Sequence, residues 1–109
     1  MAWVRVASRA AFDGREVLGV TAGGRRVAVY RLADGWFATG DTCPHAGASL
    51  SDGCIVEGHV ECPVHHALFD IRTGASDGSV TSRTLATFAV TVEGDDIYVD
   101  VPAMEERTR

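Results

Sequence analysis

Every cysteine and every histidine of this chain lies between residues 40 and 79. Most of them form two short motifs, Cys43-Pro44-His45 and Cys62-Pro63-Val64-His65, which are separated by sixteen residues. Each motif offers one thiolate and one imidazole, side chains that bind soft and borderline metal ions. Because proline fixes φ and removes a backbone donor, the proline after each cysteine stiffens its loop. Two such loops brought together form one pocket with four candidate ligands: Cys43, His45, Cys62 and His65.

Three interpretations of these motifs are open from the residues alone. The side chains could lie in loops without a metal, but two matching Cys-Pro motifs in one irregular stretch argue against coincidence. A structural Zn²⁺ site also accepts two cysteines and two histidines, although zinc fingers usually take the cysteines from one motif and the histidines from another. Each loop here holds one of each. That mixed arrangement is what a Rieske [2Fe–2S] cluster requires, because two cysteines hold one iron and two histidines hold the other.

The spacing C-x-H-x16-C-x2-H resembles the signature of Rieske proteins. Further segments that carry the resemblance are Asp41-Thr42, Ala48-Ser49-Leu50-Ser51-Asp52-Gly53, Phe69-Asp70-Ile71-Arg72-Thr73-Gly74 and Glu93-Gly94-Asp95-Asp96-Ile97-Tyr98-Val99. The resemblance covers residues 3 to 101 and implies one [2Fe–2S] cluster. By that resemblance, Cys43 and Cys62 ligate the inner iron, and His45 and His65 ligate the outer iron near the surface. It also implies an antiparallel β scaffold that carries a cluster-binding subdomain.

The resemblance also indicates which kind of Rieske protein this is. High-potential relatives carry one more cysteine in each ligand loop, joined by a disulfide, and the matching positions here are Ala48 and Val64. Those relatives place a serine and a tyrosine hydroxyl near the cluster sulfurs, where this chain has Ala67 and Phe69. Hydrogen bonds to sulfur raise the reduction potential, so their absence lowers it. We expect a potential near the low end of the Rieske range, around −150 mV.

A low-potential Rieske protein of this length resembles the ferredoxin component of bacterial aromatic-ring-hydroxylating dioxygenase systems. The resemblance implies an electron carrier in aromatic hydrocarbon breakdown, which links an NAD(P)H-dependent flavoprotein reductase to a terminal oxygenase. The chain has no Gly-rich dinucleotide fingerprint, so we expect a carrier that is not itself an enzyme. Two alternatives stay open. They are the small Rieske subunit of an assimilatory nitrite reductase and, less favoured, a zinc-stabilised interaction module.

We expect the carrier to meet its partners at the exposed tips of His45 and His65. The small apolar residues expected around those tips are Ala46, Leu50, Val64 and Ala67. The acidic residues expected to steer docking towards a basic surface are Asp41, Asp52 and Asp70. Of the remaining candidates in this stretch, we expect Cys54 to be a small buried hydrophobic residue, and His59 and His66 to be solvated.

The segments on either side of the motifs alternate in hydrophobicity with a period of two, as half-buried strands do. These segments are 3–6, 15–21, 25–32, 36–38, 88–92 and 97–101, and turn signals stand at 22–24, 34–35 and 93–95. No window shows a clean helical period with caps. We therefore predict an all-β antiparallel sandwich or barrel, in which the loop-rich residues 40–79 are inserted as the cluster-binding subdomain.

Composition and charge narrow the remaining possibilities. The chain has 109 residues, 46% of them hydrophobic and 23% charged, which indicates one globular domain spanning 1–109 rather than a disordered chain. Three cysteines, an odd number, argue against a disulfide framework. A net charge of −5 argues against a nucleic-acid partner. Without a long apolar run or a signal-peptide pattern, we expect a cytoplasmic monomer that does not contact a membrane.

Overall fold

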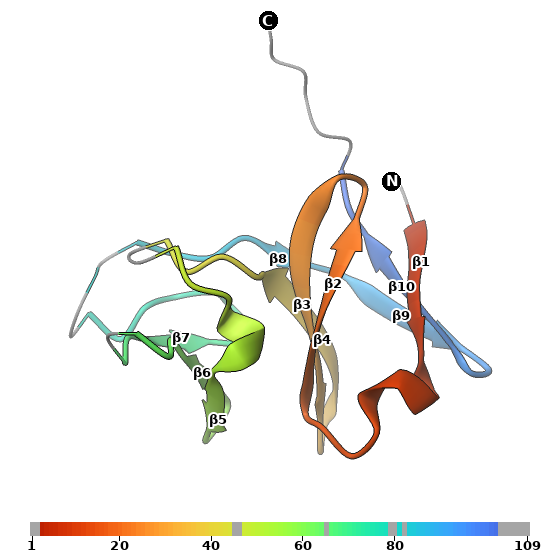
Figure 1. Ribbon diagram of the computed structural model, residues 1–109, viewed down its shortest axis with the longest axis horizontal. Coiled ribbons are helices and arrows are strands. Elements are labelled where there is room, and N and C mark those ends of the chain that lie inside the picture. The colour runs from red at the N-terminus through yellow and green to blue at the C-terminus, as the bar shows by residue number, and fades with distance from the viewer. Residues whose placement is uncertain (1–2, 45–46, 65, 79–80, 82, 103–109) are drawn as a thin grey trace, which may run out of the picture.

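The computed structural model describes residues 3–44, 47–64, 66–78, 81 and 83–102. Within these residues, ten strands form three antiparallel sheets, and two short 3-10 helices connect them (Figure 1). The predicted all-β antiparallel fold is confirmed. In this described part, no helix is long and apolar enough to cross a membrane.

Two larger sheets form the scaffold. The first has the order β1-β10-β9, formed by Trp3–Ser8, Asp96–Asp100 and Val90–Glu93. The second has the order β2-β3-β4-β8, formed by Val17–Ala22, Arg25–Leu32, Gly35–Gly40 and Thr87–Phe88. The 3-10 helix η1, Arg9–Phe12, connects β1 to β2. Figure 1 shows both sheets on one side of the molecule, so that the other side is left for the segment with the predicted ligands.

A small third sheet lies within that segment. It has the order β5-β6-β7, formed by Cys54–Val56, His59–Glu61 and Leu68–Asp70, and the 3-10 helix η2, Leu50–Asp52, precedes it. The sequence indicated only a loop-rich stretch here. Strands of three residues are too short to show a period of two, which explains why they were not predicted.

Alternate residues of β3 face two different cores, as the pleat of a strand requires. Val27 and Val29 belong to a core that also contains Ile97 of β10. Ala28 and Tyr30 point the other way and belong to a second core that contains both predicted ligand cysteines. All four of these β3 side chains are fully buried. The scaffold therefore packs directly against the candidate site through one face of the sheet that contains β3.

Hairpin turns fix the register of these strands. Gly23 and Gly24 have φ values of +59° and +84°, and the pairing of Ala22 with Arg25 leaves a two-residue loop between β2 and β3. Positive φ at both loop residues is typical of a type I′ turn, whose twist matches that of a hairpin. The turn predicted from the glycines at 22–24 is thus confirmed.

One arginine ties the third sheet to the scaffold. Arg72, just after β7, donates a hydrogen bond from Nη2 to the carboxylate of Asp34, in the turn between β3 and β4. Its guanidinium also lies over the ring of Phe37, 4.9 Å from the ring centroid, which is a cation–π contact. These contacts fix the small sheet against the β3–β4 hairpin.

Candidate metal centre

The two predicted ligand loops have the same length and the same closure. Residues 43–48 are flanked by the bridge between Thr42 and Ser49, and residues 62–67 by the pair of Glu61 and Leu68. In each loop the cysteine amide donates to the carbonyl of the sixth residue. Its N···O distance is 2.8 Å from Cys43 to Ala48 and 2.9 Å from Cys62 to Ala67. Each loop is therefore a six-residue hairpin tip that begins with cysteine and ends with alanine.

The fifth residue of each loop supplies the second closing hydrogen bond. Gly47 and His66 have φ values of +76° and +62°, in the left-handed region. The amide of Gly47 donates to the carbonyl of Cys43 at 2.8 Å, and that of His66 donates to the carbonyl of Cys62 at 3.0 Å. A cysteine, a proline and a left-handed residue thus recur at the first, second and fifth positions, although 13 residues separate the loops.

Both cysteines are buried at the base of these loops. Cys43 is 1% exposed, Cys62 is 0% exposed, and neither is in a disulfide bond. They share one apolar core, whose members include Leu50, Val60 and Phe69. Two thiols supplied by two matching loops, in surroundings that exclude water, suit a compact iron–sulfur centre. The donor set that the structure describes therefore fits such a group.

By their sequence positions, the predicted imidazole ligands belong to these two loops. His45 is the third residue of the first loop and His65 the fourth of the second, and both lie outside the described residues. Apart from residues 1–2, 45–46, 65, 79–80, 82 and 103–109, no group of three or more His, Cys, Asp or Glu side chains could hold a metal ion. The complete ligand set therefore stays a prediction.

The family of the domain that carries these loops follows from its sequence. Residues 2–89 match the Rieske [2Fe–2S] domain. The chain belongs to the Rieske family. One Rieske-type [2Fe–2S] cluster is accordingly the cofactor of the domain. The zinc-stabilised interaction module that the residues alone left open is excluded by this match.

Two proteins that match more than nine-tenths of the chain are ferredoxins of dioxygenase systems. The ferredoxin component of biphenyl 2,3-dioxygenase from Rhodococcus jostii (strain RHA1) is 37% identical over 93% of this chain and 94% of its own length. The ferredoxin of carbazole 1,9a-dioxygenase from Nocardioides aromaticivorans IC177 is 32% identical, covers 91% of this chain and 97% of its own, and has a TM-score of 0.82. The chain is thus a Rieske ferredoxin of the dioxygenase type, an electron-transfer component that is not itself catalytic.

Two further solved structures concern the oxygenase as a partner and the nitrite reductase subunit as the alternative function. A chain in the complex of reduced oxygenase and oxidised ferredoxin in carbazole 1,9a-dioxygenase is 35% identical, with a TM-score of 0.79, and covers 89% of this chain and 91% of its own. A nitrite reductase small subunit from Mycobacterium tuberculosis has a TM-score of 0.78 over 90% of this chain and 93% of its own, but is only 23% identical. The second likeness extends to the fold alone.

Asp41 anchors the first ligand loop of the Rieske domain. Its side chain is 1% exposed, and its Oδ1 accepts the amide of Ser51 at 2.8 Å. Its Oδ2 accepts the Ser51 hydroxyl at 3.3 Å and Nη2 of Arg26 at 3.2 Å. The Asp41 carbonyl accepts the amide of Leu50 at 2.6 Å. The expectation that Asp41 steers partners was wrong, because a buried carboxylate that already accepts three hydrogen bonds is not presented to a partner.

Other residues expected around the docking face also differ from the prediction. Leu50 and Ala67 are buried in the core and do not ring the loop tips, whereas Val64 is 49% exposed at the tip of the second loop. Ala46 lies outside the described residues. Asp70 accepts the amides of Arg72 and Thr73 at 2.8 and 3.1 Å, which shapes the turn after β7. Asp52 is exposed, as expected.

The remaining cysteine and histidines do not join the site. Cys54 was predicted to be buried, but it is exposed at the start of β5, because it belongs to a strand at the edge of the small sheet. His59 is half-buried, with Nδ1 3.1 Å from the carbonyl of Glu57. The exposed His66 has its Nδ1 3.0 Å from Oε2 of Glu61. Neither the His66–Glu61 contact nor the Asp41 anchor was predicted, because both depend on how the loops fold and not on a local sequence pattern.

Proposed function

We propose that Cys43, His45, Cys62 and His65 hold the [2Fe–2S] cluster in a cluster-binding subdomain of about residues 40–79, within a single domain of 1–109. The observation that supports this most strongly is the equivalence of the two loops. Matching six-residue tips place a buried cysteine at the start of each loop and a histidine one or two residues beyond the proline. Such a pair of loops would supply two thiolates and two imidazoles to one cluster.

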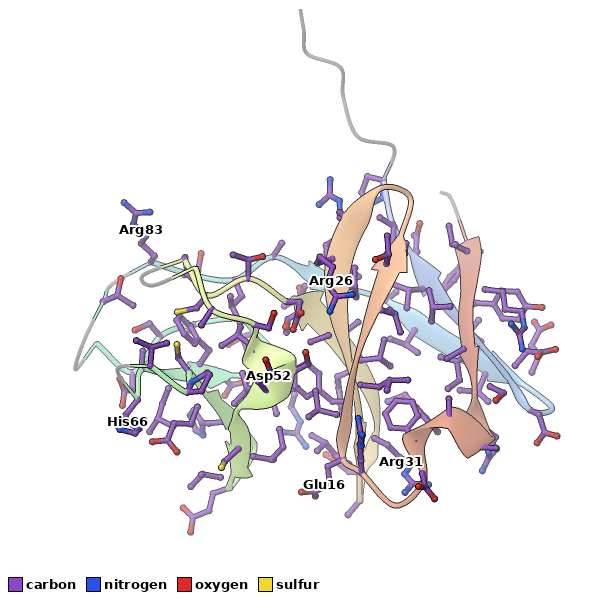
Figure 2. All side chains as sticks on the ribbon, viewed as in Figure 1. Glu16, Arg26, Arg31, Asp52, His66 and Arg83 are labelled. Atoms are coloured by element: carbon purple, nitrogen blue, oxygen red, sulfur yellow. The ribbon has the colours of Figure 1, made fainter. Side chains whose placement is uncertain are left out.

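When bound, a Rieske cluster takes up and releases one electron at a time. The chain's own residues determine where that happens. The buried cysteines keep one side of the site dry, and the exposed Val64 shows that the tip of the second loop reaches the surface. His66 and Arg83 mark this end of the molecule, which lies opposite the sheet β1-β10-β9 (Figure 2). Electrons therefore enter and leave at the loop tips.

The carrier accepts electrons from an NAD(P)H-dependent flavoprotein reductase and delivers them to a terminal oxygenase that acts on an aromatic ring. The solved complex of a related ferredoxin with its oxygenase supports the second half of this path. The names of the dioxygenase systems to which the relatives belong support the first half. The proposal includes a monomer and a cytoplasmic location, where NAD(P)H is available.

Reconstitution tests this proposal. The cluster-loaded protein is mixed with NADH and the flavoprotein reductases encoded in the same genome, and its visible absorption is followed. We expect bleaching only when a reductase is present, and recovery of the colour when a terminal oxygenase, its aromatic substrate and oxygen are added. If the reduced protein instead passed electrons only to a sirohaem nitrite reductase, the proposed partner would be wrong.

A further inference from the structure

A pocket lies beside the first ligand loop on the scaffold side. Its volume is about 390 Å³. Its walls include Arg25 and Arg26 at the start of β3, Thr42 and Pro44 at the start of the loop, and Phe88 of β8. Because Pro44 is the second residue of the first ligand loop, whatever enters this pocket lies beside that loop.

The pocket carries one positive charge that no described residue neutralises. Asp41 also lines it, but that carboxylate is already bound by Arg26 and Ser51. Arg25 has no carboxylate partner among the residues that the structure describes, and its buried Nε has no hydrogen-bond acceptor. An arginine donor that is buried without an acceptor is unfavourable. Arg25 therefore has a positive charge without a described counter-ion, and an anion in the pocket would supply one.

Arg25 is held in place by stacking. Its guanidinium carbon lies 5.5 Å from the centroid of the Phe88 ring, a cation–π arrangement that limits the positions of the side chain. A guanidinium fixed in this way needs little further ordering when it binds, and its planar fork matches the two oxygens of a carboxylate. Thr42 also lines the pocket, and a threonine side chain carries a hydroxyl that can donate.

Arg83 is a further arginine beside the first ligand loop. Nη1 of Arg83 donates to the carbonyl of Pro44 at 3.2 Å, and no described carboxylate pairs with it. Figure 2 shows Arg26 near the segment that leaves β4 and Arg83 near its outer end. Although the whole chain has a net charge of −5, the first ligand loop is thus bordered by arginines.

We propose that this pocket receives the carboxylate of an aspartate or glutamate from the redox partner protein, which pairs with Arg25. The proposal rests on the proposed function, because it takes the occupant to be the protein that exchanges electrons at the loop tips. It replaces the expected acidic steering face with a basic contact, in keeping with the burial of Asp41. A carboxylate in this pocket brings the partner surface against Pro44 and thus next to Cys43.

The first test measures steady-state electron transfer from the reductase and to the oxygenase as a function of ferredoxin concentration. Arg25→Gln is expected to raise the KM for ferredoxin about tenfold with at least one partner, the size of one lost charge-assisted hydrogen bond. The cluster spectrum is expected to stay the same. Arg25→Lys keeps the charge and is expected to recover part of the loss. Arg9→Gln, in the exposed helix η1, is the matched control and is expected to change nothing.

The second test uses the absence of lysine from the sequence. Arg25→Lys and Arg9→Lys each introduce a single side-chain amine, which a carbodiimide couples to a carboxylate in direct contact. We expect the amine introduced by Arg25→Lys to become cross-linked to an Asp or Glu of a partner peptide. We expect no such cross-link from the amine of the Arg9→Lys variant. The proposal that a partner carboxylate occupies the pocket would be wrong, with the proposed function intact, under two results together. These are an unchanged KM for Arg25→Gln and no cross-link from the Arg25→Lys variant. Failure of the wild-type protein to accept or deliver electrons would overturn the proposed function instead.

Discussion

Gly47 and His66 occupy the same place in the two ligand loops. Each is the fifth residue of its loop, with φ of +76° and +62°, and each donates its amide to the carbonyl of the cysteine four residues earlier. Glycine adopts this conformation without a steric penalty, whereas a residue with a Cβ does not. The second loop tolerates histidine here with its ring outside the core and against Glu61.

Gly47→Ala is expected to lower the free energy of unfolding by about 1 kcal/mol, because alanine is strained at positive φ. Steric overlap adds nothing, since no atom lies within 4 Å of a Cβ built at position 47. The measurement is chemical denaturation of the cluster-loaded protein. Gly40→Ala is the control, because it has the same open space without a positive φ. Equal stabilities of the two variants would contradict the conformational argument.

Asp41→Ala is expected to lower the free energy of unfolding by about 2–3 kcal/mol, because it leaves the amide of Ser51 and the guanidinium of Arg26 without their acceptor. The same variant is expected to lose its cluster faster, since Asp41 holds the base of the first ligand loop. Denaturation and the decay of visible absorption measure the two effects. Asp52→Ala removes an exposed carboxylate nearby and serves as the control. A loss below about 0.5 kcal/mol in Asp41→Ala would show that Asp41 is not an anchor.

The scaffold and the cysteines could be predicted from sequence because their signals are local. Strand β3 was predicted with its observed bounds, since 25–32 alternates between turn glycines on both sides. The third sheet was missed because each of its strands has three residues. Burial was hardest to predict near the site. Asp41 and Cys54 were both placed wrongly, because their exposure depends on Arg26, Ser51 and the edge of a sheet that the sequence did not reveal.

The reduction potential is expected to lie around −150 mV at pH 7, because the buried, apolar Ala67 and Phe69 stand at the positions where high-potential relatives have hydroxyls that donate to sulfur. Ala67→Ser restores one donor and is expected to raise the potential by up to about 60 mV, the one-electron equivalent of one such hydrogen bond. Redox titration followed by visible absorption measures both values. Ala89→Ser, at an exposed site before β9, is the control. A wild-type potential well above zero would contradict this account.

Tyr30 is expected to make stability depend on pH at the alkaline end. Burial, and to a smaller extent the nearby Asp41 charge, raise the pKa of Tyr30, although a hydrogen bond with Thr39 opposes the shift. Above about pH 10 the unfolded chain loses this proton while the folded chain keeps it, so stability falls by up to about 1.4 kcal/mol per pH unit. Denaturation between pH 8 and about pH 11 measures this slope. The free energy of unfolding of Tyr30→Phe is expected to fall less steeply with pH than that of the wild-type protein. Equal slopes for the two proteins would contradict the burial of an un-ionised phenol.

The most direct test of the account is pulsed electron paramagnetic resonance of the reduced protein, which detects the nitrogens bound to the cluster. The chain has four histidines, two of them in the predicted ligand set, so His59→Ala and His66→Ala are matched controls. We predict couplings to two imidazole nitrogens in the wild-type protein and in both controls, and the loss of those couplings or of the cluster in His45→Ala and His65→Ala. A wild-type spectrum without nitrogen coupling, or one that changes in the His59→Ala or His66→Ala control, would contradict the assignment of His45 and His65.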